Sequence, residues 1–404
     1  MASTWPSTIW MAKRSNSFGA ARFRARLFAA CVAAIGACAP AVASACPFCT
    51  ALAPSLCQLR DQAAITALAE VEAQSPALQS RLRLHRVVAG SDRLKGKDSV
   101  EVALDVAARP GSLLLVFGTG PVSAAAVDLT WHAVPVNETS YAYFARSPGL
   151  KVAVAERLRY FAPFLEHADP LVAQDAYLEF GHAAFDEVAR VAEILPLARM
   201  RDWLVDPKVP QDRKGFYGLA LGLGGDAQAR RENAEFLRQL ILAPQDDFRA
   251  GFDGILGGYL LLSGTGGLEL IERRYLDNPR AADGDMRHAM TALRFYREYG
   301  HGIPAARLAA ALRGLVKRSE FAAAAITDLA RWKDWDSLDT ISGLYGQGAY
   351  AQPAIARAIV GYLLVCPGPK AAEALARLRK QDPRGIAEAE RVLSRTTTTT
   401  PSDL

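Results

Sequence analysis

Histidine and cysteine, on which most metal sites and many catalytic sites depend, are scarce in this sequence of 404 residues. Six of each are present. No two histidines have the i, i+4 spacing that places two ligands on one helix face. They are scattered over the chain as His85, His132, His167, His182, His288 and His301. We therefore predict no metal site, no cofactor and no catalytic residue.

Phosphate-binding loops and activated nucleophiles are also missing. Gly222-Leu223-Gly224-Gly225 and Gly264-Thr265-Gly266-Gly267 are rich in glycine, but neither follows a predicted strand or precedes a Lys-Ser/Thr pair. We expect both to be turns between helices. Ser263 has no Gly-x-Ser-x-Gly elbow around it. These absences favour a protein without enzymatic activity.

The positive net charge of the chain comes entirely from the residues before Cys46. The chain has 47 Lys and Arg against 42 Asp and Glu. Five of the cations precede Cys46, where no acidic residue occurs, so the remainder balances at 42 against 42. They are Lys13, Arg14, Arg22, Arg24 and Arg26. A neutral protein has no electrostatic footprint for nucleic acid, so no nucleic-acid partner is expected.

Residues 1–45 have the pattern of a secretory signal peptide. The cations lead into an apolar stretch from Leu27 to Gly36, and Ala43-Ser44-Ala45 is a small-x-small cleavage site. Met11 is an alternative start. The other processing route is that of a lipoprotein, because Ile35-Gly36-Ala37-Cys38 resembles a lipobox and would place a lipid anchor on Cys38. We predict an exported protein, located in the periplasm, the cell envelope or the extracellular space.

Long hydrophobic runs are missing beyond the leader. No later segment has about 18 uninterrupted apolar residues, the length that a membrane-spanning helix needs. We therefore expect no transmembrane helix in the mature chain.

Four cysteines remain after the predicted cleavage: Cys46, Cys49, Cys57 and Cys366. Exported proteins fold in oxidising compartments, so all four are disulfide candidates, with three possible connectivities. Cys46-Pro-Phe-Cys49 also resembles the redox motif of glutaredoxins, which implies an alternative function as a thiol-disulfide oxidoreductase. That motif normally follows a strand, and here it begins the mature chain.

Residues 46–148 are predicted to form a small antiparallel β-barrel. Residues 65–71, 81–88, 100–106 and 113–117 are predicted to be strands, with alternating apolar and polar residues along 100–106 and an apolar run along 113–117. The segment resembles the netrin/TIMP-like module, an OB-type barrel, through Cys46, Val87-Val88, Leu94-Lys95-Gly96 and Gly111 to Gly118. TIMPs begin with Cys-x-Cys and this chain has Cys-x-x-Cys, so protease inhibition is not carried over.

Residues 149–393 are predicted to form an α-solenoid of two-helix repeats. In Pro163 to Ala183, Asp169-Pro170 is a helix start, and Val172, Ala176 and Phe180 form an apolar face. Similar helices begin near residues 213, 248, 286, 321 and 353, a spacing typical of solenoids. The first pair resembles a HEAT repeat at Pro163, Leu165, Asp169, Val172 and Ala176, with Ala173 where that family has Arg. Residues 394–404 are a Thr-rich tail that we expect to be disordered.

Aromatic residues near the C-terminal end are candidates for partner contacts. Trp332 and Trp335 are three positions apart, which places them on one face of a helix, and Tyr345 and Tyr350 follow. The flanking Asp334 and Asp336 are expected in a solvated loop. The sequence thus predicts an exported, non-enzymatic interaction or scaffold protein that binds protein partners through its solenoid surface or its β-module.

Overall fold

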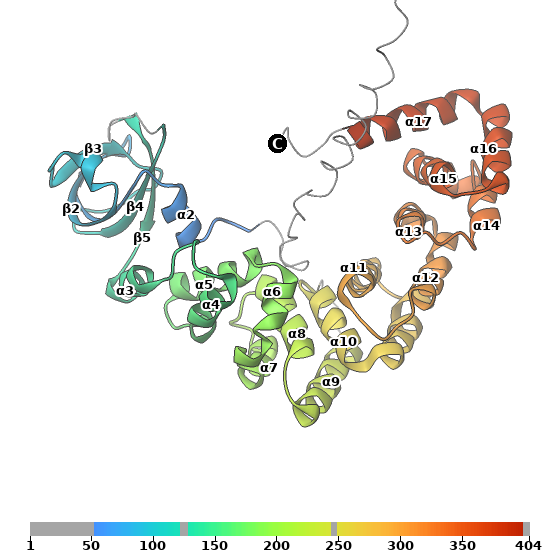
Figure 1. Cartoon of the computed structure of the whole chain (residues 1–404), viewed down its shortest axis with the longest axis horizontal. Coiled ribbons are helices and arrows are strands. Elements are labelled where there is room, and N and C mark those ends of the chain that lie inside the picture. The colour runs from blue at the N-terminus through green and yellow to red at the C-terminus, as the bar shows by residue number, and fades with distance from the viewer. Residues whose placement is uncertain (1–51, 122–127, 244–248, 399–404) are drawn as a thin grey trace, which may run out of the picture. The chain divides into compact units, whose positions relative to one another are not determined.

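The structure is a computed structural model that describes residues 52–121, 128–243 and 249–398. The predicted signal peptide, Cys38, Cys46 and Cys49 lie outside these residues. All described residues belong to one unit that begins at Ser44. They form sixteen α-helices, α2 to α17, and a five-stranded antiparallel half-barrel that precedes most of them (Figure 1).

The strands of the half-barrel are close to those that the alternation predicts. They are β1 (Ile65–Gln74), β2 (Gln79–Ala89), β3 (Ser99–Ala103), β4 (Leu113–Thr119) and β5 (Thr130–Pro135), in the sheet order β3-β2-β1-β4-β5. The prediction missed β5. It also extended the third strand to residue 106, whereas the chain leaves the sheet after Ala103. Asp105 then turns to the opposite edge, where its carboxylate accepts the Ala133 N–H at 2.9 Å.

Strand β4 contributes to two hydrophobic cores because its side chains alternate between the two faces of the sheet. Leu114 and Val116 are fully buried inside the half-barrel, beside residues of β1 and β5 such as Trp131. Leu115 and Phe117 are fully buried in the other core, which continues into the helices. The boundary predicted between residues 148 and 149 therefore falls within a packed junction.

The helical part follows the predicted order of helices. Each predicted repeat start lies within about one turn of an observed helix start. The helices are α2 (Leu56–Gln62), α3 (Glu138–Arg146), α4 (Val154–Phe161), α5 (Pro170–His182), α6 (Phe185–Arg190), α7 (Leu197–Val205), α8 (Gln211–Leu223), α9 (Ala227–Leu242), α10 (Phe252–Ile271), α11 (Asp283–Tyr299), α12 (Ala305–Arg313), α13 (Ser319–Arg331), α14 (Leu338–Gly343), α15 (Pro353–Val365), α16 (Pro369–Gln381) and α17 (Pro383–Thr398). The 3₁₀ turn η3 (Ala162–Phe164) and the π-turn η5 (Glu272–Leu276) continue α4 and α10.

Helices that lie near one another in the chain also pack together. Contacts join α8 to α10, α10 to α11, α13 to α15 and α15 to α17. Asp169 caps α5 by accepting the N–H groups of Leu171 and Val172, and Pro170 occupies the first turn, as the sequence predicts. Helix α17 runs to Thr398, so residues 394–398, which we assigned to a disordered tail, continue a helix.

Glycine allows α8 and α10 to approach each other closely. Gly215, Gly218 and Gly222 on α8 face Gly254 and Gly258 on α10, and a Cβ atom on Gly254 would lie 1.9 Å from the Gly215 carbonyl oxygen. The expected turn at Gly264 is instead a kink within α10, where Gly264 has a φ of 54° and a ψ of −131°. A backbone conformation of this kind favours glycine.

Phe252–Leu276 is, within the described part of the chain, the one segment that is long and apolar enough to cross a membrane. Half of its most apolar window is buried within the protein, where it packs against α8, α9 and α11. Such contacts are those of a core helix.

Candidate functional site

The four aromatic residues proposed for partner contacts have different contacts in the structure. The Tyr345 hydroxyl donates to Asp382 at 2.9 Å, and the Tyr350 hydroxyl donates to the Lys317 carbonyl oxygen at 2.5 Å. Trp332 caps the C-terminal end of α13 and packs partly buried against the core. Of the four, Trp335 alone lines the apolar groove described next.

This groove lies between the C-terminal ends of α13 and α15 and has a volume of about 490 Å³. Its walls are mainly apolar and are formed by Ala330, Trp335, Gly361, Val365 and Pro367. Val365 is 60% exposed. Exposed apolar surface in a groove is a common mark of an interaction site.

Trp332 and Trp335 differ in position because the helix ends between them. The three-residue rule that we applied holds only inside a helix. Trp332 is the C-cap of α13, and Lys333 then adopts a left-handed conformation with φ of 57°, which turns the chain out of the helix. Our prediction of one shared helix face was therefore wrong.

Trp335 is fixed in place from both sides. Its ring lies edge-on to Tyr362, with centroids 5.2 Å apart, and the Tyr362 hydroxyl donates to the Asp334 carbonyl oxygen at 2.8 Å. Arg313 binds the carboxylates of both neighbours, Asp334 through Nε at 3.0 Å and Asp336 through Nη2 at 2.6 Å. The Asp334 side chain is only 9% exposed, so our expectation of a solvated acidic loop was wrong for this residue.

The rim of the groove is cationic. Arg331 and Lys333 line it and are exposed, and neither forms an ion pair with another described residue. Tryptophan and arginine, both present in the lining of this groove, are enriched at protein interfaces in general. The groove contains no nucleophile with an adjacent base.

A buried polar network that was not predicted from the sequence lies at the junction between the half-barrel and the helices. Asp175 and Glu179 lie one turn apart on α5, and each is 2% exposed. Asp175 accepts the Leu56 N–H at 2.7 Å and the Tyr143 hydroxyl at 2.8 Å. Glu179 accepts the Ser55 hydroxyl at 2.5 Å and pairs with Arg157. The carboxylates therefore dock the start of α2 onto α5.

Burial disfavours the charged forms of Asp175, Cys57 and Tyr143 at this junction. Burial raises the pKa of Asp175 to about 6, against the hydrogen bonds from Leu56 and Tyr143 that favour its charged form. Burial, followed by the charge of Glu179, raises the pKa of the Cys57 thiol to about 12. Burial also raises the pKa of Tyr143. A thiol in this state is a poor nucleophile, so we assign the network a structural role.

The structure describes two of the four cysteines that were predicted to form disulfides. Cys57 and Cys366 are buried free thiols, and Cys57 lies 3.5 Å from the Ser147 hydroxyl. Cys46 and Cys49 lie outside the described residues, so the disulfide assignment and the redox alternative both stay predictions. Among the described residues, no group of three or more His, Cys, Asp or Glu side chains is placed to hold a metal ion.

Comparison with known proteins gives no match for this chain among family models, curated proteins or solved structures.

Proposed function

We propose that this is an exported, non-enzymatic protein that binds a partner polypeptide in the groove between α13 and α15. The observation that carries the proposal is the exposure of Val365 in a groove that Trp335 also lines, with the Trp335 ring packed edge-on against Tyr362. A binding surface that is already ordered loses little conformational entropy when the partner arrives. Export is supported by the leader sequence in residues 1–45.

The groove is proposed to accept an apolar side chain next to an acidic one. Trp335 and Val365 would pack on the apolar group. Arg331 and Lys333 at the rim would attract a carboxylate from water and fix the orientation of the partner.

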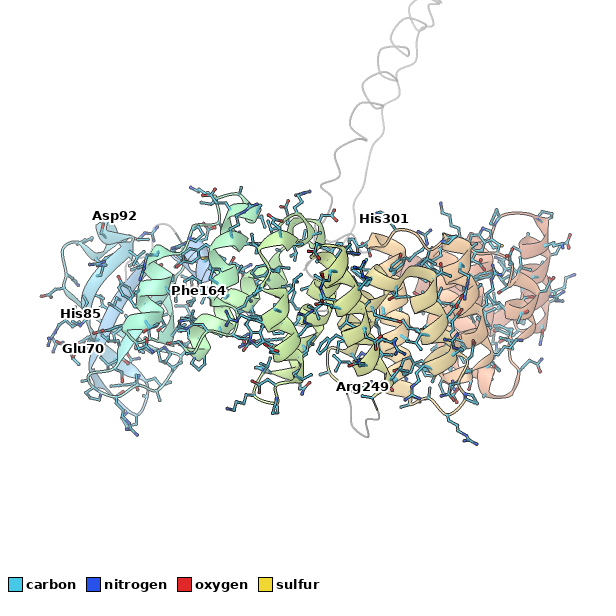
Figure 2. The ribbon with its side chains drawn as sticks, turned by 90° about the horizontal axis from the view of Figure 1, so that it is seen from below. Glu70, His85, Asp92, Phe164, Arg249 and His301 are labelled. Carbon is cyan, nitrogen blue, oxygen red and sulfur yellow. The ribbon has the colours of Figure 1, made fainter. Side chains whose placement is uncertain are left out.

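The scaffold is proposed to be a HEAT-like solenoid that follows an OB-type, netrin-like barrel. Support for repeats comes from hydrogen bonds that join residues 34 to 37 positions apart, the length of one two-helix repeat. They join Arg159 to Glu193, Arg249 (labelled in Figure 2) to Asp285, Arg294 to Asp328, Arg307 to Glu272, Tyr177 to Asp212, Tyr275 to Ile241 and Tyr345 to Asp382. Support for the barrel comes from the five antiparallel strands.

The test compares two valines of equal exposure. Val365 is 60% exposed in the groove, and Val205 at the end of α7 is 58% exposed elsewhere. Peptides selected from a displayed library on the wild-type protein are titrated calorimetrically against Val365→Glu and Val205→Glu. A carboxylate in the apolar groove should weaken binding at least tenfold in the first variant only. Equal affinity for both variants, or no peptide that binds the wild type, would refute the proposal.

A further inference from the structure

A second cavity, of about 470 Å³, lies between α3, α4, η3 and the start of α5. Four rings line it, those of Tyr143, Tyr160, Phe164 and His167. The ring of Phe164 (labelled in Figure 2) is central, with its centroid 4.9 Å from that of Tyr143, 5.3 Å from Tyr160 and 6.0 Å from His167. Aromatic walls of this kind bind apolar or aromatic groups.

Opposite charges line this aromatic cavity at two separate positions on α3. Glu138 is in the first turn of α3 and Arg146 is its last residue, and both are exposed. Eight residues of helix separate them by about 12 Å along the axis. Neither side chain forms an ion pair with a described residue. Arg146 Nε donates to the Ala142 carbonyl oxygen at 3.1 Å, which directs the guanidinium without neutralising it.

Two of the polar groups on the rings are already engaged within the protein. The Nδ1 atom of His167 accepts the Asp169 backbone N–H at 3.0 Å. The Tyr160 hydroxyl donates to the Tyr143 carbonyl oxygen at 2.8 Å. Glu138 and Arg146 are the carboxylate and the guanidinium that line the cavity.

We propose that this cavity binds a short peptide with free ends, its ammonium group at Glu138 and its carboxylate at Arg146. An extended chain covers at most about 3.5 Å per residue, so three or four residues span the separation. A central aromatic side chain would pack on Phe164 and Tyr160. A single amino acid is too short to reach both charges, and an internal segment of a protein lacks the terminal ammonium and carboxylate groups.

The experiment uses four forms of one tripeptide, Ala-Phe-Ala: unmodified, N-acetylated, C-amidated and doubly capped. Calorimetric titration of the full chain should show that each cap weakens binding about tenfold, because each removes one charge-assisted contact. In Arg146→Gln, amidation should have no further effect and acetylation should keep its effect. In Glu138→Gln, acetylation should have no further effect and amidation should keep its effect.

Controls separate binding from folding. Arg280→Gln removes an exposed arginine outside the cavity and should leave all affinities unchanged. Phe164→Ala should abolish binding, with circular dichroism to verify the fold. Equal binding of the free and doubly capped peptides, an amidation effect that persists in Arg146→Gln, or no binding at all would overturn the proposal. Because this cavity and the groove share no residue, either proposal can fail without the other.

Discussion

A Cβ atom on Gly258 would lie 2.0 Å from the carbonyl oxygen of Gly218, well inside van der Waals contact. Gly218 itself also lies close to the backbone of α10, since a Cβ atom on Gly218 would lie 2.8 Å from the backbone nitrogen of Ile255. Helices α8 and α10 therefore touch backbone to backbone, and their packing depends on glycine at these positions.

Gly258→Ala should destabilise the protein although alanine is the better helix former. Alanine gains up to about 1 kcal/mol in helix propensity, but the two helices must separate to admit the methyl group, which costs more. We expect a net loss of about 2 kcal/mol in the free energy of unfolding, measured by urea titration. Gly266→Ala is the matched control, because its Cβ has no neighbour within 4 Å, and it should stabilise by about 0.5–1 kcal/mol. Similar effects of the two substitutions would contradict this account of the packing.

Asp175→Asn should change how stability depends on pH. The fold raises the pKa of Asp175 from 3.8 to about 6, so it favours the protonated form. The resulting stabilisation is complete below pH 3.8 and is lost as the pH rises through 6. Asparagine does not ionise, so the variant should gain about 3 kcal/mol relative to the wild type between pH 4 and 7, as an order of magnitude. Unfolding free energies that differ by a constant over this range would exclude the buried ionisation.

Cys57 should resist alkylation in the folded protein. A rise in its pKa from 9.0 to about 12 lowers the thiolate fraction about 1000-fold at a given pH, and the thiolate is the reactive form. Pulsed iodoacetamide labelling and peptide mass spectrometry would measure the rate. The same protein in guanidinium chloride is the control and should react at the rate of an ordinary thiol. Rapid labelling in the folded state, or a disulfide at Cys57, would contradict the structure.

Arg313→Leu should destabilise the protein more than the removal of a surface arginine. Arg313 is the partner of Asp334, whose side chain is 9% exposed, and its loss leaves that carboxylate uncompensated. Because Arg313 itself is 29% exposed, we expect about 2 kcal/mol in the free energy of unfolding. Arg379→Leu breaks the exposed pair with Glu390 and should cost less than about 1 kcal/mol. Equal losses would mean that the pair of Arg313 with Asp334 stabilises the protein no more than an exposed ion pair does.

Local features of the fold could be predicted because their causes are local. Asp169-Pro170 starts α5 through its own side chain and ring, and the alternation in β3 is visible in the sequence itself. Strand β5 was missed although Trp131 and Ala133 alternate inward.

Features that depend on distant partners could not be predicted. Asp175 and Glu179 have the spacing of an exposed helix face, and they are buried only because α2 brings Ser55 and Leu56 to them. The groove could be predicted in part. Trp335 was singled out from its residue type, but its separation from Trp332 depends on a left-handed residue at Lys333, a conformation that lysine rarely adopts.

The hydrogen bond between Leu56 and Asp175 spans 119 positions, whereas most helices pair with close neighbours. During synthesis at ~5–20 residues per second, α2 would wait roughly 6–24 seconds before α5 existed to receive it. Leu115 and Phe117 of β4 would wait with it, since their core is completed by the same helices. Until α5 is present, the half-barrel would therefore expose the apolar face formed by Leu115 and Phe117.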